Sequence, residues 1–138
     1  MEGTSGEIVY PTLEQIKEIN RRMIKESGGL FVEPDNTLNL AAIEYILESI
    51  KANLFGIDLY PKLLDKACEL AVHIITRHCF NDGNKRTGIA VALEFLQANN
   101  TKIKFDRSIV NLAVQIADGK AGAKELQGWF ILRIRERQ

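Results

Sequence analysis

The fold is decided between residues 63 and 96, which read LLDKACELAVHIITRHCFNDGNKRTGIAVALEFL. Apolar residues cover most of the circumference of a helix over 63–77, and the sequence after Gly83 is again mostly apolar as far as Leu96. A helix that is apolar on nearly every side is buried in the protein interior. The sequence therefore predicts two buried helices that flank one polar loop.

Two more helices are predicted ahead of this stretch. Thr12 and Gln15 form a capping-box pattern before apolar residues at helical spacing, which indicates a first helix over 13–27. A glycine pair ends it, and residues 28–37 also contain a proline and an Asp-Asn pair, so they form a loop or a short hairpin. A second helix is predicted from about 40 to 53.

The remaining elements follow from turn and capping residues. Pro61 suits the first turn of the helix that contains 63–77. Residues 101–105 alternate as in a short extended segment, and Asp106 is placed to cap the next helix. A last helix follows, and we expect the charged residues 133–137 to be its solvated end.

The predicted fold class is all-α: a compact single-domain bundle of about six helices with one short hairpin or loop. Residues 1–11 are an N-terminal lead, and residues 12–138 are the domain. A chain of 138 residues can bury a core without help from disulfides or metals. No internal period of about 20 to 50 residues is present, so the chain is not a repeat protein.

Composition restricts the class of function. Lysine and arginine together number 18, as do aspartate and glutamate, so no net charge attracts nucleic acid or an anionic membrane. No apolar run is long enough to span a bilayer, and residues 1–10 lack the pattern of a secretory signal. Cys68 and Cys79 form no paired motif and are expected in the core, which fits a reducing compartment. We therefore expect a cytoplasmic protein.

The polar loop and the start of the next helix hold the candidate chemistry, in the run HCFNDGNKRTG at 78–88. A helix N-terminus after a glycine turn presents free backbone N–H groups and the positive end of the helix dipole, which together bind anions. Lys85 and Arg86 add charge to that site. Asp82 offers the oxygen ligand that Mg²⁺ prefers, and His78 can accept a hydroxyl proton near neutral pH.

Each of these residues also has a plainer explanation. An Asn-Asp-Gly-Asn run alone is a turn signal, and a Lys-Arg pair alone is a solvated cap. A lone histidine is most often structural, and we interpret His73 in that way. Trp129 and the phenylalanines outside the motif are interpreted as core residues. The order of His78, Asp82 and Lys85 between two apolar helices favours a functional site over separate structural roles.

The run His-x-Phe-x-Asp-Gly-Asn-Lys-Arg, from His78 to Arg86, resembles the signature of the Fic/Doc superfamily, and in particular of its Doc (death on curing) toxin branch. Doc proteins are likewise single small helical domains. The similarity covers about residues 12 to 132, although only the motif is highly specific. The comparable residues outside the motif are Leu59-Tyr60-Pro61, Lys66-Ala67, residues 90–96 and Trp129.

The resemblance implies a role for each polar residue of the motif. His78 is the general base that takes the proton of the target hydroxyl, Asp82 holds Mg²⁺, and Arg86 is the third catalytic residue. Phe80 anchors the loop in the core. The residues that contact the phosphates of ATP are Gly83, through its backbone, Asn84, Lys85 and Arg86.

Two reactions are known in this superfamily. Fic enzymes mostly transfer AMP from ATP, whereas Doc phosphorylates a threonine of elongation factor Tu and so stops translation. AMP-transferring motifs have a glycine at the position of Lys85 and a second arginine at the position of Ile89, so both differences favour the Doc reaction. The resemblance thus implies a Mg-ATP-dependent protein Ser/Thr kinase that acts as a toxin, with AMP transfer as the alternative.

Two further positions depart from the family pattern. Cys79 follows the motif histidine where a proline is common, which leaves the local backbone less fixed. Residues 30–36 occupy the place of the family's target-docking flap, but with other side chains than Doc proteins have. The resemblance in that loop therefore does not extend to the target contacts.

The expected partners are an antitoxin and a protein substrate. Self-regulated members of the superfamily carry an inhibitory Ser/Thr-x-x-x-Glu helix, and no serine or threonine here has a glutamate four residues on. We therefore expect a separate antitoxin, which lays a disordered segment as a helix in a groove. Two other classes stay open: a nucleic-acid-binding module, which zero net charge disfavours, and an inactive binding protein, which the intact motif disfavours.

Overall fold

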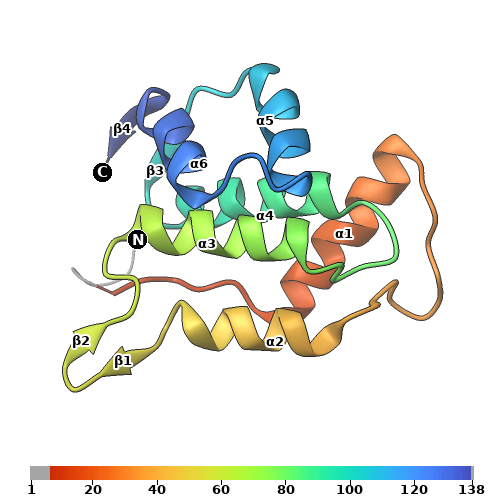
Figure 1. The fold of residues 1–138 in the computed structure, drawn as a ribbon, viewed down its shortest axis with the longest axis horizontal. Coiled ribbons are helices and arrows are strands. Elements are labelled where there is room, and N and C mark those ends of the chain that lie inside the picture. Colours follow the sequence, from red (N-terminus) through yellow and green to blue (C-terminus); the bar gives the residue numbers. More distant parts are fainter. Residues whose placement is uncertain (1–6, 138) are drawn as a thin grey trace.

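Two helices at the centre carry the fold. α3 (Leu63–Thr76) and α4 (Asn84–Ala98) pack against each other, and the other helices pack around them (Figure 1). Gly88 of α4 permits this close approach, because a Cβ there would lie 2.8 Å from the Ala71 carbonyl oxygen and 2.7 Å from the Ile75 side chain. The two buried helices predicted from the sequence are therefore confirmed.

The structure, a computed structural model, describes residues 7–137. Within that range it contains six helices and four short strands, which confirms an all-α domain of about six helices. No helix of this part of the chain is long and apolar enough to cross a membrane. The elements other than α3 and α4 are α1 (Leu13–Ser27), α2 (Leu40–Ser49), β1 (Asn53–Leu54), β2 (Ile57–Asp58), β3 (Thr101–Ile103), α5 (Ser108–Ala117), α6 (Ala123–Ile131) and β4 (Ile134–Arg137).

The bounds of α1 are those predicted. Thr12 Oγ1 accepts a hydrogen bond from Gln15 N at 3.1 Å, and Gln15 Oε1 accepts one from Thr12 N at 2.9 Å, so the capping box is formed. At the other end Gly28 has a φ of +85°, which a glycine adopts without strain.

The core contains both cysteines, Trp129, Phe95 and Phe130, as predicted, but not every phenylalanine that was assigned to it. Phe55 and Phe105 are 94% and 54% exposed, because Phe55 forms the turn between β1 and β2 and Phe105 lies in the loop before α5. Cys68 and Cys79 are fully buried, and Trp129 is 8% exposed. Burial raises the pKa of both thiols, that of Cys79 to about 11, so they stay protonated at neutral pH. The two cysteines are structural rather than reactive.

The prediction for the end of α2 was wrong. The helix ends at Ser49 instead of Asn53, and a two-residue turn joins β1 to β2. Phe55 and Gly56 both have positive φ, +55° and +81°, which is the geometry of a tight hairpin turn. Asn53 Oδ1 accepts from Gly56 N at 3.0 Å and stabilises it. The short hairpin is therefore here, and residues 28–37 form a loop.

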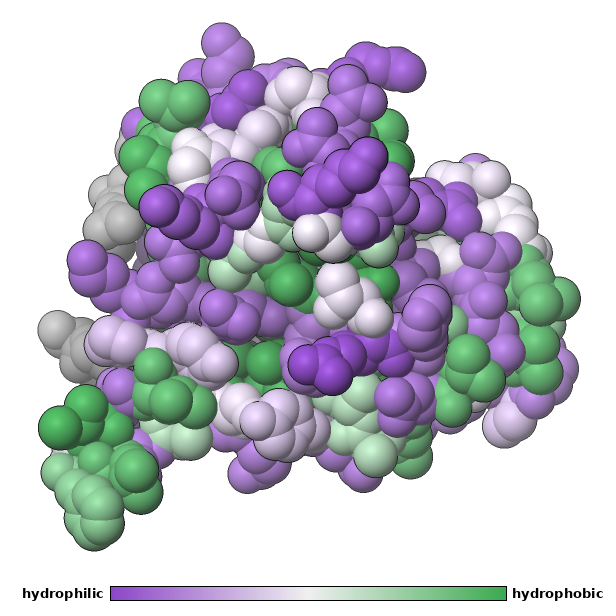
Figure 2. Space-filling view, in the orientation of Figure 1, coloured by the Kyte–Doolittle hydropathy of each residue, from purple (hydrophilic) through white to green (hydrophobic). Residues whose placement is uncertain are grey.

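This hairpin presents an apolar tip to solvent (Figure 2). Phe55 is 94% exposed and Ile57 72% exposed, and Leu54 and Leu59 are exposed beside them. The hairpin lies at the opposite end of the molecule from the loop between α3 and α4 (Figure 1). It therefore forms no part of the site built from that loop.

The C-terminal prediction also needs correction. Residues 133–137 were expected to be a solvated helix end, but Ile134–Arg137 form β4, which pairs antiparallel with β3. Arg133 Nε donates to Asp106 Oδ2 at 2.6 Å, and its guanidinium lies 4.2 Å from the centre of the Trp129 ring. Arg133 thus has partners that no helical periodicity could indicate.

Two expected helix starts differ in their details. Asp106 Oδ1 accepts from Ser108 N at 2.8 Å, so the aspartate bonds to the first turn of α5 as predicted, although Arg107 is the residue that directly precedes the helix. Pro61, expected in the first turn of α3, lies just before Lys62, the residue that precedes the helix.

Candidate functional site

The motif loop, residues 77–83, is anchored at Phe80. This side chain is 1% exposed. Asn84 clamps the same residue from the first turn of α4, since its Oδ1 accepts from Phe80 N and its Nδ2 donates to Phe80 O, both at 2.9 Å. Phe80 therefore anchors the loop as expected, and the Asn84 amide serves the loop backbone.

A second loop lies against the motif loop at the same end of the molecule (Figure 1). We call residues 28–37 the flap loop. The Cys79 carbonyl accepts from Leu38 N at 2.8 Å, and the Asn36 carbonyl accepts from Asn81 N at 2.9 Å. Two segments far apart in sequence thus form one surface.

Asp82 links the two loops through its carboxylate. Its Oδ2 accepts from Leu30 N and its Oδ1 from Gly83 N, both at 2.8 Å. These two backbone hydrogen bonds, with the nearby charges of Arg86 and Lys85, lower the pKa of Asp82 below its ordinary value. The carboxylate is therefore ionised at neutral pH.

The start of α4 leaves backbone donors available. Gly83 precedes the helix with a φ of +80°, and no side chain caps this terminus. The N–H groups of the first turn have no acceptor within the helix, so they point towards any anion placed there. Lys85 is exposed in the same turn and makes no hydrogen bond or ion pair within the described residues.

Arg86 is placed differently from Lys85. One of its terminal nitrogens donates to the Gly28 carbonyl at 3.0 Å, and the other lies 3.4 Å from the Met23 carbonyl oxygen. These carbonyls belong to the end of α1, where the helix dipole favours a cation. Arg86 therefore holds α1 to the site in addition to lining it.

The two histidines differ as the sequence predicted. His78 is exposed, has a φ of +52°, and its ring makes no hydrogen bond to another described residue. His73 is half-buried and stacks on Tyr45, with 5.5 Å between the ring centres. Burial, with the charge of Arg77, lowers the pKa of His73, which favours the neutral ring in that stack.

The structure brings all of the predicted site residues into one cleft of about 470 Å³. The cleft lies between the motif loop, the first turn of α4 and the end of α5. Its lining residues from the motif are His78, Asn81, Asp82, Gly83, Asn84, Lys85 and Arg86, and the others are Ile75, Thr76 and Ala117.

The oxygen ligands of the cleft suit a metal ion that is already bound to the phosphates of a nucleotide. In the described part of the chain, no three His, Cys, Asp or Glu side chains come together as a metal cage. Asp82 is one ionised oxygen donor, and each of its oxygens keeps a lone pair beyond its hydrogen bond. Mg²⁺ is commonly bound by one or two carboxylates together with phosphates and water, so this arrangement suits Mg²⁺ with a nucleotide.

Sequence reasoning missed two residues beside the site. Asn20 and Asn36 are fully buried and both bond to the carbonyl of Asp82. The available signal was the position of Asn20, which follows Ile16 and Ile19 on the apolar face of α1. A polar residue on such a face needs a buried partner.

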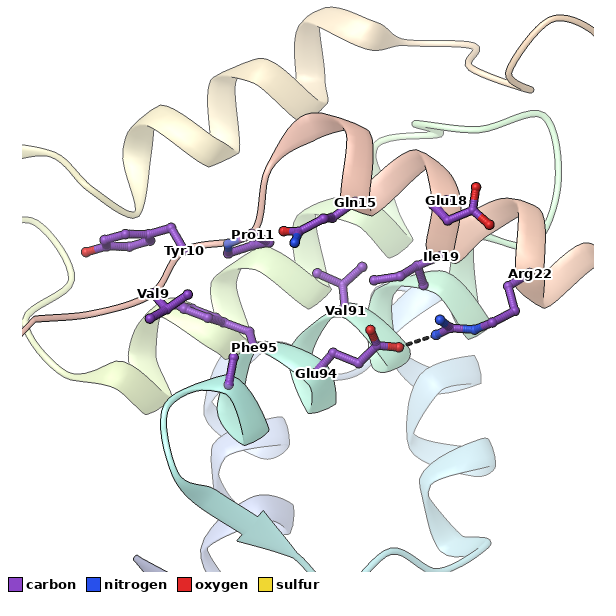
Figure 3. A pocket seen from close by; sticks show the side chains of 11 residues that line it. Val9, Tyr10, Pro11, Gln15, Glu18, Ile19, Arg22, Val91, Glu94 and Phe95 are labelled. Carbon is purple, nitrogen blue, oxygen red and sulfur yellow. Dashed lines mark hydrogen bonds and ion pairs between the residues drawn. The ribbon is translucent and has the colours of Figure 1, made fainter. Parts of the chain in front are cut away.

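Further hollows lie along α4. A cleft of about 300 Å³ beside its C-terminal half is lined by residues such as Val9, Ile19 and Phe95, and the Arg22–Glu94 ion pair crosses it (Figure 3). It contains no residue of the motif. An apolar groove of about 390 Å³ lies instead between α1, α4 and α5. Its lining residues are Met23, Ser27, Lys85, Arg86, Ile89, Ala90, Leu93, Phe105, Ile109, Val110, Ala113 and Val114.

The sequence of this chain is similar to those of known proteins. A profile of the Fic/DOC family matches residues 10–96, which is more than half of the chain. The chain belongs to the Fic/DOC family. Within the family it is similar to a curated protein named Toxin Doc from Mycolicibacterium smegmatis, with 41% identity over 56 residues. That match covers 41% of this chain and 43% of the relative.

These matches confirm the resemblance to the Fic/Doc superfamily and to its Doc branch. The family profile includes the whole motif loop, α3 and nearly all of α4. The matched part thus contains the six predicted site residues, His78 and the residues from Asp82 to Arg86.

Proposed function

We propose that this Fic/DOC protein transfers the γ-phosphate of Mg-ATP to a serine or threonine hydroxyl of another protein, as the toxin of a toxin–antitoxin pair. One observation carries the proposal. Lys85 lies exposed in the first turn of α4, in one cleft with His78 and Asp82, without an ion pair to a described residue. A cation at a helix N-terminus suits a terminal phosphate. The similarity to a Toxin Doc supports the same assignment.

Each polar side chain of the cleft has its own role in the transfer. The exposed His78 ring accepts the proton of the target hydroxyl as the hydroxyl oxygen bonds to the γ-phosphorus of ATP. The bond from that phosphorus to the β–γ bridging oxygen breaks, and ADP leaves. The first-turn N–H groups of α4 and Lys85 hold the phosphate oxygens. Asp82 provides an oxygen ligand for Mg²⁺, which neutralises phosphate charge when bound. Arg86 uses two N–H donors on α1 carbonyls and keeps others for phosphate.

The choice between phosphate and AMP transfer depends on Lys85. A glycine at this position, as in AMP-transferring relatives, leaves room for the inner phosphates of ATP beside the helix terminus. The lysine side chain fills that room and adds a point charge, so the terminal phosphate is the one that faces His78. AMP transfer is the alternative, and Ile89 in place of a second arginine disfavours it.

The target and the reaction can be tested together. By resemblance the substrate is elongation factor Tu, so the purified factor is incubated with Mg-ATP and the protein, and its mass is measured. We expect the addition of one phosphoryl group, and none when Asp82→Ala replaces the wild-type protein. Addition of an adenylyl group would establish the alternative. If the factor stays unmodified but the protein phosphorylates another protein in a cell extract, only the target is rejected and the reaction is kept.

We propose further that the antitoxin binds the groove between α1, α4 and α5. The groove is apolar along α4 and α5, where Val110 and Val114 are 59% and 41% exposed. Lys85 and Arg86 line both this groove and the cleft. An amphipathic helix with an acidic residue at one end would therefore cover the apolar wall and block the phosphate site at once.

This regulation can be measured by growth. Expression of the chain alone should stop growth, and co-expression of its antitoxin should restore it. Val110→Glu should prevent rescue, because it places a charge on the apolar wall, whereas Leu132→Glu, at an exposed position outside the groove, should be rescued. Rescue of Val110→Glu would place the antitoxin elsewhere.

A further inference from the structure

Two asparagines outside the motif meet behind the motif loop. Asn20 belongs to α1 and Asn36 to the flap loop, and both are fully buried. Asn36 Nδ2 donates to Asn20 Oδ1 at 3.0 Å, so the two amides bond to each other. Buried amides are costly unless their hydrogen bonds are made, so this pair restricts how the two segments can lie.

Both amides converge on the backbone of Asp82. Its carbonyl oxygen accepts from Asn20 Nδ2 at 3.0 Å, and Asn36 Nδ2 lies 3.4 Å away. The carboxylate of the same residue accepts from Leu30 N of the flap loop at 2.8 Å. Asp82 is thus held through its main chain and through its side chain by groups outside the motif.

The network continues into α4 and back into the flap loop. Asn20 Nδ2 also donates to Thr87 Oγ1 at 3.0 Å, and Asn36 Oδ1 accepts from Val32 N at 2.8 Å. Four segments are therefore connected: α1, the flap loop, the motif loop and α4. No buried side-chain nitrogen or oxygen of the described residues lacks a partner, so the network is saturated.

Gly83 keeps open the space that the network needs. A Cβ at this position would lie 3.2 Å from Asn20 Nδ2 and 2.8 Å from Ile24 Cδ1. A side chain there would press on Asn20 and move it from the Asp82 carbonyl. The motif glycine therefore serves the buried network as well as the turn into α4.

We propose that Asn20 and Asn36 are positioning residues of the transfer reaction, which fix Asp82 relative to His78 and to the flap loop. Neither residue lines the cleft, so they act through Asp82. The inference rests on the proposed function, because it assigns the network to the placement of the Mg²⁺ ligand. A displacement of about 1 Å in such a ligand can reduce the rate roughly 100-fold.

The test uses substitutions that leave the backbone unstrained. Asn20→Ala removes an amide from a helix interior, and Asn36→Gly removes one at a φ of +64°, which glycine adopts freely. Asn99→Ala is the matched control, because Asn99 also makes three hydrogen bonds, two to Val9 and one to Phe95, at the far end of α4.

We expect kcat per folded molecule to fall about 10- to 100-fold in Asn20→Ala and in Asn36→Gly. KM for Mg-ATP should change less, since Lys85 and the α4 terminus remain. The double variant should be no slower than the slower single variant, because both remove one network. Asn99→Ala should lose stability and keep its kcat. An unchanged kcat in Asn20→Ala, at the same fraction folded, would overturn the proposal.

Amide hydrogen exchange tests the same network without any reaction. The N–H groups of Leu30 and Asn81 bond across the two loops, to Asp82 and Asn36 respectively. Both should exchange faster in Asn20→Ala and remain protected in Asn99→Ala. Unchanged exchange at both amides rejects the positioning role. If both amides exchange faster in Asn20→Ala but the wild-type protein transfers no γ-phosphate, the proposed function is rejected and the role of the network in holding the two loops is kept.

Discussion

At each end of α4 an asparagine side chain ties a neighbouring segment to the helix, and a cleft lies beside it. Asn84 holds Phe80 at the N-terminal end, and Asn99 holds Val9 at the C-terminal end. The two clefts have volumes of about 470 and 300 Å³. Similar clamps and hollows therefore occur at both ends, and neither distinguishes a functional site.

The charges of the two clefts are what differ. In the C-terminal cleft Arg22 pairs with Glu94 (Figure 3). Glu18 of the same cleft pairs with Arg21, which lies outside it, with 3.6 Å between Glu18 Oε1 and Arg21 Nε, so each of these charges has a partner. In the N-terminal cleft Lys85 and the His78 ring have no partner among the described residues. Unpaired groups on a backbone that is firmly held are available to a ligand, which supports our proposal that the N-terminal cleft is the reactive one.

The largest expected effect is the loss of the base at the N-terminal cleft. His78→Gly should reduce transfer by about 10² to 10⁴, which is the usual contribution of a general base. Glycine suits the φ of +52° at this position, so the loss cannot be attributed to strain. His73→Gln, which changes the structural histidine, should keep most of the activity in the same phosphate-incorporation assay. Full activity of His78→Gly would show that the N-terminal cleft does not provide the general base.

A second prediction concerns how tightly the N-terminal half of α4 is held. Gly88→Ala should lower the free energy of unfolding by about 1–3 kcal/mol, because the new methyl group meets the Ala71 carbonyl of α3. Gly128→Ala is the control, since Gly128 lies inside α6 with nothing within 4 Å of its added Cβ. That change should stabilise by about 0.5–1 kcal/mol in urea titrations. Equal effects at the two sites would contradict the packing argument.

A third prediction follows from the lowered pKa of Asp82. A carboxylate with a depressed pKa stabilises the fold fully above its unfolded pKa, about 3.9, and this contribution is lost as the pH falls through the folded pKa. Asp82→Asn should therefore be less stable than wild type at neutral pH. The difference should shrink towards zero in acid. Urea unfolding at both pH values measures it, and a difference independent of pH would contradict the assigned hydrogen bonds.

The smallest effect is expected at the C-terminal cleft. Arg22→Ala breaks an ion pair between side chains that are 41% and 45% exposed, and such pairs contribute at most about 1 kcal/mol. Transfer should be unchanged, since the cleft contains no motif residue. A tenfold loss of transfer with an intact fold would show that both clefts take part.

The sequence predicted the parts of this comparison that depend on local pattern. The bounds of α1, the buried pair of α3 and α4 and the residues of the cleft follow from periodicity, capping and one dense motif. The hairpin at Asn53 and the pairing of β4 with β3 were missed, because short strands depend on partners distant in sequence. Asn20 and Asn36 were missed for the same reason, since a single asparagine in a sequence does not indicate which residues its side chain bonds to in the fold.

The sequence alone could not separate the roles of the two cations, Lys85 and Arg86. They are adjacent, and both were assigned to contact the phosphates of ATP. In the structure Arg86 bonds to carbonyls of α1, whereas Lys85 is left to the cleft. This division depends on where α1 ends in space, and no residue within the motif encodes it.

The central claim, that the N-terminal cleft presents the γ-phosphate to His78, is tested most directly by the fate of a label. The protein and its target are incubated with Mg-ATP labelled at either the γ- or the α-phosphate, for wild type and for Lys85→Gly. We predict that wild type places only the γ-label on the target and that Lys85→Gly loses this activity. Label from the α-phosphate on the target of the wild-type protein would contradict the central claim and establish AMP transfer.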